Sequence, residues 1–121
     1  MGTGMRRYDT SALKVSVEEL TRIAGETYGD LIKAVVDVAQ VVLLLDLELH
    51  ADGEAALLDG GSRQEDIWGI NLYPGSYGSP DFIEFDSMIN IRPRQGNRTR
   101  GVDDPVLRQR ISEIVYGVVE K

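Results

Sequence analysis

The chain of 121 residues contains no cysteine and a single histidine, His50. The absence of cysteine excludes a disulfide framework, a thiolate metal site and a cysteine nucleophile. A single histidine excludes, within one chain, any site that needs two imidazoles. Nucleophilic chemistry of the Ser-His-Asp kind would have to use His50 or could not occur.

Long apolar runs are also missing. The most hydrophobic segment, residues 31–45, is interrupted by Lys33 and Asp37, and its longest uncharged run has eight residues. A helix needs about 20 apolar residues to cross a bilayer. The first residues, with Arg6 and Arg7, lack the apolar stretch of a signal peptide. We therefore expect no membrane segment and a cytoplasmic location.

The composition is that of an ordinary globular protein, with 42% hydrophobic and 27% charged residues. The length suits one domain and is too short for two of typical size. We predict a single domain over residues 1–121, in which residues 1–12 form a flexible N-terminal segment.

Charge is unevenly distributed along the chain. The formal net charge is −7, yet residues 92–110 contain six arginines and two aspartates. An acidic body repels nucleic acid and anionic membranes. Duplex DNA is not an expected partner, because one short basic loop offers only about four phosphate contacts.

Several elements are indicated by their end signals. Ser16 and Glu19 form a capping box that predicts a helix over residues 16–28. The Val- and Leu-rich residues 31–49 predict two antiparallel strands joined near Ala39-Gln40, with one continuous helix over residues 30–45 as the alternative.

Further along, Asp52 is expected to cap a short helix that ends at Leu58. Strands are predicted at residues 67–73 and 82–92, and Asp104-Pro105 is expected to open a final helix. Hairpins without crossover helices indicate an α+β fold. We predict a single antiparallel sheet of about four strands, in the order α-β-β-α-β-β-α, packed by the N- and C-terminal helices.

The first candidate site is an arginine-rich loop at residues 92–100. Guanidinium groups form bidentate, charge-assisted hydrogen bonds with phosphate or carboxylate, and the amides of a glycine-containing loop can cradle an anion. The alternatives are pairing of these arginines with neighbouring carboxylates and contact with a protein partner. The predicted ligand-binding residues are Arg92, Arg94, Asn97, Arg98 and Arg100.

The second candidate site is acidic. If neighbouring strands bring them together, His50, Glu84 and Asp86 would meet on the polar side of the sheet and could ligate Mg²⁺ or act as general acid and base. A solvated sheet face is the alternative, and no standard metal-ligand spacing occurs. We therefore predict neither a metal site nor a cofactor. Further acidic residues expected near this face are Asp46, Glu48, Asp52 and Glu54.

Long strings in the chain resemble a family of small prokaryotic proteins with a domain of unknown function. The strings are HAD at residues 50–52, EDIWGINLYP at 65–74, and FDSMINIRP at 85–93 followed by QGNR at 95–98. The resemblance covers roughly residues 30–119 and differs at Ala39-Gln40, where the family implies a more turn-prone sequence. It implies no activity, substrate or catalytic residue.

The leading functional hypothesis is a binding module whose loop 92–100 holds a small phosphate- or carboxylate-bearing ligand. One alternative is a metal-assisted hydrolase that uses His50, Glu84 and Asp86. The other is a partner-binding or homo-oligomeric protein, for example a homodimer in which the basic loop meets the acidic face of a second copy.

Overall fold

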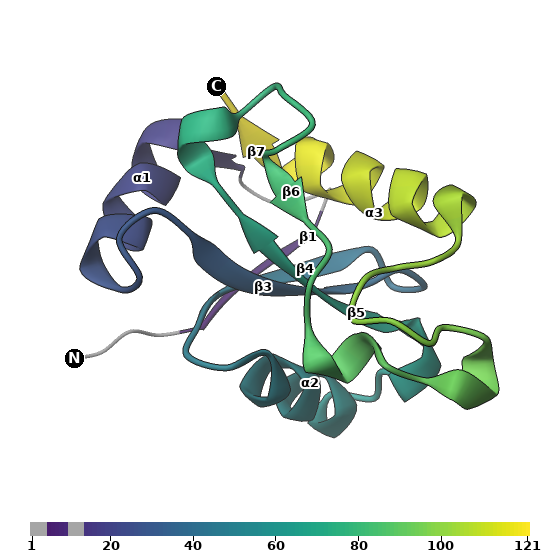
Figure 1. Cartoon of the computed structure of the whole chain (residues 1–121). Helices are drawn as coiled ribbons and strands as arrows, with labels where there is room; N and C mark the ends of the chain where they lie inside the picture. Colours follow the sequence, from purple (N-terminus) through teal and green to yellow (C-terminus); the bar gives the residue numbers. More distant parts are fainter. Residues whose placement is uncertain (1–4, 10–13) are drawn as a thin grey trace.

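Five antiparallel strands form the central sheet of the protein (Figure 1). The structure, a computed structural model, describes residues 5–9 and 14–121. Along the sheet the order is β1-β4-β3-β5-β6. The strands are β1 (Arg6–Asp9), β3 (Ile32–Asp37), β4 (Val42–Leu47), β5 (Ile67–Leu72) and β6 (Ile83–Glu84). The α+β class is thus confirmed, with five strands instead of about four.

The fifth strand comes from the N-terminal segment. Arg6–Asp9 pair with the outer edge of β4, from Arg6 opposite Leu45 to Asp9 opposite Val42. The sequence patterns did not predict this strand, because its four polar-rich residues gain their order from pairing with β4. The remainder of the predicted flexible segment, residues 1–4 and 10–12, lies outside the described residues.

Three helices flank the sheet, α1 (Val17–Glu26), α2 (His50–Asp59) and α3 (Pro105–Val118). Ser16 caps α1 as predicted, and its Oγ accepts a hydrogen bond from the Glu19 amide at 3.0 Å. Asp104 caps α3 in the same way, at 2.9 Å from the Val106 amide. Two further short strands, β2 (Val15–Ser16) and β7 (Val119–Glu120), pair in parallel beside the helix ends.

The sheet is covered on both faces, whereas the sequence predicted cover by the two terminal helices alone. The α1 and α3 helices lie on one side and α2 on the other (Figure 1). The first core includes Leu20, Ile70 and Ile111, and the second includes Val35 and Leu57. Each face of the sheet therefore has its own apolar layer. The face that α2 covers is buried and is not a solvated surface.

The α2 helix begins at His50, two residues before the predicted cap. The Asp52 carboxylate still acts at this end of the helix, because it accepts a hydrogen bond from the Leu49 amide at 3.2 Å. Gly53 lies against the sheet, where an added Cβ would stand 2.6 Å from Leu47 Cδ1 and 2.7 Å from Val35 Cγ2. A glycine is therefore needed for the close approach of α2 to the sheet.

The predicted hairpin of β3 and β4 is confirmed, and the helical alternative is wrong. Its turn is organised by the buried Asp37 carboxylate, whose Oδ1 accepts hydrogen bonds from the amides of Ala39 and Gln40, both at 2.9 Å. The other carboxylate oxygen accepts one from Ser62 Oγ at 2.5 Å. Asp37 thus supplies the turn chemistry that glycine or asparagine usually provides.

A bulge in β4 changes which residues share a face. The register between β3 and β4 shifts between Lys33 and Val35, and Asp46 has a positive φ of 64°. Leu45 therefore packs in the core under α1 and α3, while Leu47 packs under α2. The expectation that Asp46 lies near one polar sheet face with His50 is wrong, because of this bulge and because β4 ends at Leu47, so that His50 lies in α2 and not on a strand.

The predicted strand at residues 82–92 is also wrong over most of its length. Only Ile83–Glu84 pair with β5, and the chain then forms a 3-10 turn at Met88–Asn90.

The described residues include no helix with the length and apolarity required to cross a membrane.

Candidate functional site

Asn90 explains why the chain leaves the sheet after β6. Its side chain is buried, accepts a hydrogen bond from the Gly69 amide at 2.8 Å and donates to the Gly69 carbonyl at 2.9 Å. The same amide nitrogen donates to the carbonyl of Arg100 at 2.9 Å. One side chain thus replaces the backbone pairs that a longer β6 would have made with β5.

Asn97 holds the arginine-rich loop from inside. Its Nδ2 donates to the carbonyls of Asn90 at 2.7 Å and Gly101 at 2.8 Å, and its Oδ1 accepts from the Asp103 amide at 2.7 Å. The residue is buried. Both ends of this predicted ligand-binding amide are therefore engaged with the loop backbone.

Arg92 ties the loop to the central sheet. Its guanidinium stacks over the Trp68 ring at 4.2 Å and donates to the carbonyls of Gln64 and Ile67. Its Nε donates to the Ile89 carbonyl at 3.1 Å. Burial lowers the pKa of this guanidinium, and the charges of Glu54 and Asp66 offset part of this effect. Arg92 therefore stabilises the fold rather than presenting its charge to a ligand.

The other arginines of the loop are exposed. Arg100 Nε lies 2.6 Å from Asp86 Oδ1, which forms an ion pair at the surface. The structure shows no partner for the guanidinium groups of Arg94 and Arg98 among the residues it describes. Two of the five predicted ligand-binding residues thus carry cations free of internal partners, and a third carries a cation held at one nitrogen.

A cavity of about 490 Å³ brings the two predicted sites together. It lies on the α2 side of the sheet, between the start of α2, strand β5 and the chain around β6. We call it the His50 cavity. His50, Glu84 and Asp86 from the predicted acidic site line it together with Arg100 from the arginine-rich loop. Its other polar walls are formed by Lys33, Asn71, Tyr73 and Ser87.

His50 is the first residue of α2 and only 8% exposed. Its Nε2 lies 2.8 Å from the Ile70 carbonyl oxygen, which can only accept, so Nε2 carries the proton and Nδ1 of the neutral ring is an acceptor. Burial lowers the pKa of the imidazole, and the bond to Ile70 offsets part of this effect. At neutral pH the ring is therefore uncharged.

Asn71 and Glu84 face each other across strands β5 and β6. Asn71 Nδ2 donates to Glu84 Oε1 at 2.8 Å, and the Tyr73 hydroxyl donates to the same oxygen at 3.2 Å. Asn71 Oδ1 is fully buried and has no hydrogen-bond partner among the described residues. Asn71 does not stand out in the sequence, because the pairing of the two strands creates the arrangement. Asn71, Tyr73 and Lys33 were not predicted as site residues.

Gly69 on β5 packs against two residues that line the cavity, His50 and Ser87. A Cβ at this position would lie 2.7 Å from both Cβ and Oγ of Ser87 and 3.2 Å from Cγ of His50. Glycine therefore lets both side chains pack directly on β5, which fixes the position of the imidazole.

The rest of the predicted acidic site does not converge on this cavity. Asp46 and Glu48 line a different depression of about 400 Å³, next to Tyr28 at the end of α1. In the described part of the chain, no group of three or more histidine, aspartate or glutamate side chains is placed to hold a metal ion. The predicted acidic site is thus divided between two depressions, and only His50, Glu84 and Asp86 line the His50 cavity.

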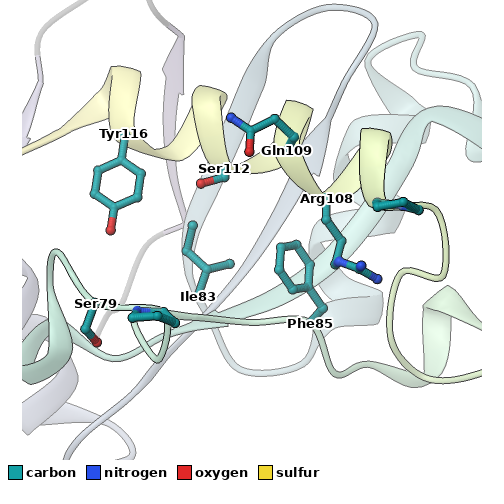
Figure 2. Close-up of a pocket in the computed structure, with 9 residues that line it drawn as sticks. Ser79, Ile83, Phe85, Arg108, Gln109, Ser112 and Tyr116 are labelled. Atoms are coloured by element: carbon teal, nitrogen blue, oxygen red, sulfur yellow. The ribbon is translucent and has the colours of Figure 1, made fainter.

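A second depression lies between α3 and the chain at residues 79–85, with a volume of about 250 Å³. Figure 2 shows Tyr116 and Arg108 of α3 extending toward Ile83 and Phe85 on the facing segment. The Arg108 guanidinium is engaged by the Val102 carbonyl at 2.6 Å. Among described residues the one buried side-chain atom without a partner lies instead at the His50 cavity, which makes that cavity the stronger candidate.

Comparison with known proteins gives a family without an assigned role. Residues 12–118 match the model of a family described as "Protein of unknown function (DUF5674)". A search of curated proteins and a search of solved structures each gave no match.

Proposed function

Because the chain belongs to DUF5674, a family of unknown function, we propose its function from the geometry of its site: a binding module that holds a small phosphate- or carboxylate-bearing ligand in the His50 cavity. One observation carries the proposal. Arg100, which comes from the arginine-rich loop, lines the same cavity as the buried His50 and Asn71.

The cationic side of the cavity suits an anionic group. Arg100 donates to Asp86 through Nε, which leaves its two terminal nitrogens for a bidentate contact. The pair with Asp86 uses Nε alone, so a ligand held by the terminal nitrogens leaves this exposed pair, which contributes only about 0–1 kcal/mol, in place. Lys33 adds a second positive charge to the wall, and the start of α2 adds the positive end of a helix dipole.

The two other exposed arginines have a secondary role. Arg94 and Arg98 lie on the same loop, and their positive charge attracts an anion over a distance of about one Debye length, roughly 8 Å in physiological salt. We expect them to affect the association rate more than the bound state. The metal-assisted hydrolase stays the alternative, and in the described residues no three histidine, aspartate or glutamate side chains lie close enough together to hold a metal ion.

The test is a calorimetric titration of the protein with inorganic phosphate, acetate and a set of small phosphate monoesters at low salt. At least one probe is expected to bind saturably. Arg100→Gln should weaken that binding at least tenfold, because it removes a charge-assisted contact. Arg98→Gln, the matched control on the same loop, should weaken it less than threefold.

Absence of saturable binding by every probe would overturn the proposal. Equal affinities of the unaltered protein and Arg100→Gln would place the ligand elsewhere and overturn it as well.

The homodimer and the cytoplasmic location stay predictions. Light scattering at low and high salt tests the homodimer, which electrostatic pairing of loop and acidic face would make salt-sensitive.

A further inference from the structure

We infer that the ligand of the His50 cavity presents an N–H donor, as a primary ammonium or amide group, in addition to its anionic group. This inference rests on the proposed function and narrows it to a chemical class. It follows from hydrogen-bond acceptors on three lining residues, Asn71, Glu84 and His50, that have no donor among the described residues.

Asn71 Oδ1 is the first of these acceptors. Leaving a buried carbonyl oxygen unpaired is unfavourable, because it loses its bonds to water without gaining a partner, so such atoms are rare in folded proteins. The orientation of the amide is fixed, because Nδ2 lies 2.8 Å from Glu84 Oε1 and a flipped amide would bring oxygen against carboxylate. The residue is 7% exposed and lines the cavity, while Oδ1 itself is closed to solvent, so a donor in the cavity reaches this oxygen when the side chains that cover it shift.

Two more acceptors line the same cavity. Glu84 Oε1 already receives the Asn71 amide and the Tyr73 hydroxyl, whereas Oε2 has no donor among the described residues. His50 presents Nδ1 as an acceptor, because the Ile70 carbonyl holds the proton on Nε2. The Asn71 side chain favours a protonated imidazole, but burial keeps the ring neutral, so among the described residues neither Nδ1 nor Asn71 Oδ1 has a donor at neutral pH.

The donors of the cavity lie on its other residues. Arg100 and Lys33 supply N–H groups and positive charge, and Asp86 is already paired with Arg100. A simple anion would satisfy these cations but would leave Asn71 Oδ1 unpaired. A ligand with both an N–H group and an anionic group complements both sets, and a cavity of about 490 Å³ accommodates a small molecule of this kind.

The test compares three phosphate monoesters that differ in one group. O-Phosphoethanolamine carries an ammonium with N–H donors, phosphocholine carries a cation without them, and ethyl phosphate carries neither. Calorimetry at pH 7.5 should give O-phosphoethanolamine an affinity at least tenfold higher than the other two. The pair 4-aminobutanoate and pentanoate makes the same comparison for carboxylates.

Two variants locate the effect. Asn71→Leu removes the unpaired acceptor and should abolish the preference for the amine. Glu84→Gln keeps an oxygen for the Asn71 amide, removes the carboxylate charge and should reduce the preference at least threefold, so it serves if Asn71→Leu does not fold. Glu113→Gln, an exposed change on α3, should leave the preference unchanged.

The outcomes separate the two proposals. Equal affinity within both series would overturn the inference and leave anion binding in place, with water as the partner of Asn71 Oδ1. Equal affinity of phosphocholine and O-phosphoethanolamine would show that the site recognises the positive charge of the amine and not its N–H donors. That result also overturns the inference. Absence of binding by every probe would overturn both proposals.

Discussion

Three polar side chains of the segment 87–103 direct their hydrogen bonds inward. Asn90 pairs with the backbone of Gly69, Asn97 closes the loop on itself, and Arg92 binds carbonyls at the edge of β5. The arginines of this segment therefore have different roles, although they lie close together in the sequence. Burial and partners decide whether an arginine in this loop stabilises the fold or is available to a ligand.

The first prediction concerns this division among the arginines. Arg92→Ala should lower the free energy of unfolding by about 2–3 kcal/mol, because it removes hydrogen bonds from a charged donor and the contact with Trp68. Arg92→Lys should not restore it, since an ammonium lacks the planar fork. Urea unfolding followed by circular dichroism measures the effect.

Arg94→Ala is the matched control, and its effect should stay within about 0.5 kcal/mol. Equal effects of the two alanine variants would contradict the structural role given to Arg92.

The second prediction concerns the titration of His50. Burial disfavours the charged ring, so the pKa in the folded protein lies below the unfolded value of 6.5. Lys33 acts in the same direction, while Ile70, Asn71 and Asp86 favour the protonated form. Stability should be unaffected by His50 above about pH 6.5 and should decrease as the pH falls from there through the folded pKa.

Proton NMR measures this pKa directly, because the chain has one histidine and its imidazole signal needs no assignment. The folded protein should titrate below the midpoint found in concentrated urea. A folded midpoint equal to or above the unfolded one would show that Asp86 and the hydrogen bonds outweigh burial.

At the scale of elements, α2 has the largest consequence for the site. It covers the second face of the sheet and places His50 beside β5. Its apolar contact is narrow, because only Leu57 on this helix is a buried large side chain, within a layer that includes Val35, Leu44 and Ile67. The position of the cavity thus depends on a small number of contacts.

The third prediction compares two adjacent leucines of α2. Leu57 is 2% exposed and Leu58 is 41% exposed. Leu57→Ala should destabilise the protein by about 2–5 kcal/mol, since it removes buried methyl groups and leaves a cavity. Leu58→Ala should cost less than about 1 kcal/mol. Denaturant titration of both variants tests this, and similar losses would contradict the packing of α2 on the sheet.

At the scale of the whole molecule, the two cores meet in one sheet. Trp68 is part of the core under α1 and α3, and its ring contacts Arg92. Arg92 in turn is bonded to the carbonyl of Ile89, which lines the cavity. Strands β3, β4 and β5 each contribute residues to both cores, so loss of the sheet would remove both.

The fourth prediction is that the chain unfolds as one cooperative unit. Trp68, the single tryptophan, reports on the centre of the sheet, and far-ultraviolet circular dichroism reports on the three helices. In urea the two signals should give the same midpoint, as expected for a small single domain. Separate midpoints would show that the cavity-side segment or a helix unfolds independently.

The sequence by itself determined the elements whose signals are local. The cap residues Ser16 and Asp104 begin the two outer helices because their side chains bond to amides two or three positions along the chain. The β3–β4 hairpin followed from the Val- and Leu-rich pattern, and β5 from its short apolar run. Such signals depend on residues that are close together in the sequence, so they can be recognised without knowledge of the tertiary fold.

Only the tertiary structure decided the rest. The apolar alternation at residues 82–92 is typical of a strand, but the Asn90 side chain takes the backbone partners on Gly69 and the strand ends early. The bulge at Asp46 moved Leu47 to the other face. The meeting of His50, Asn71 and Arg100 depends on strand order and on α2 crossing beneath the sheet, because contacts between residues far apart in sequence leave no local pattern.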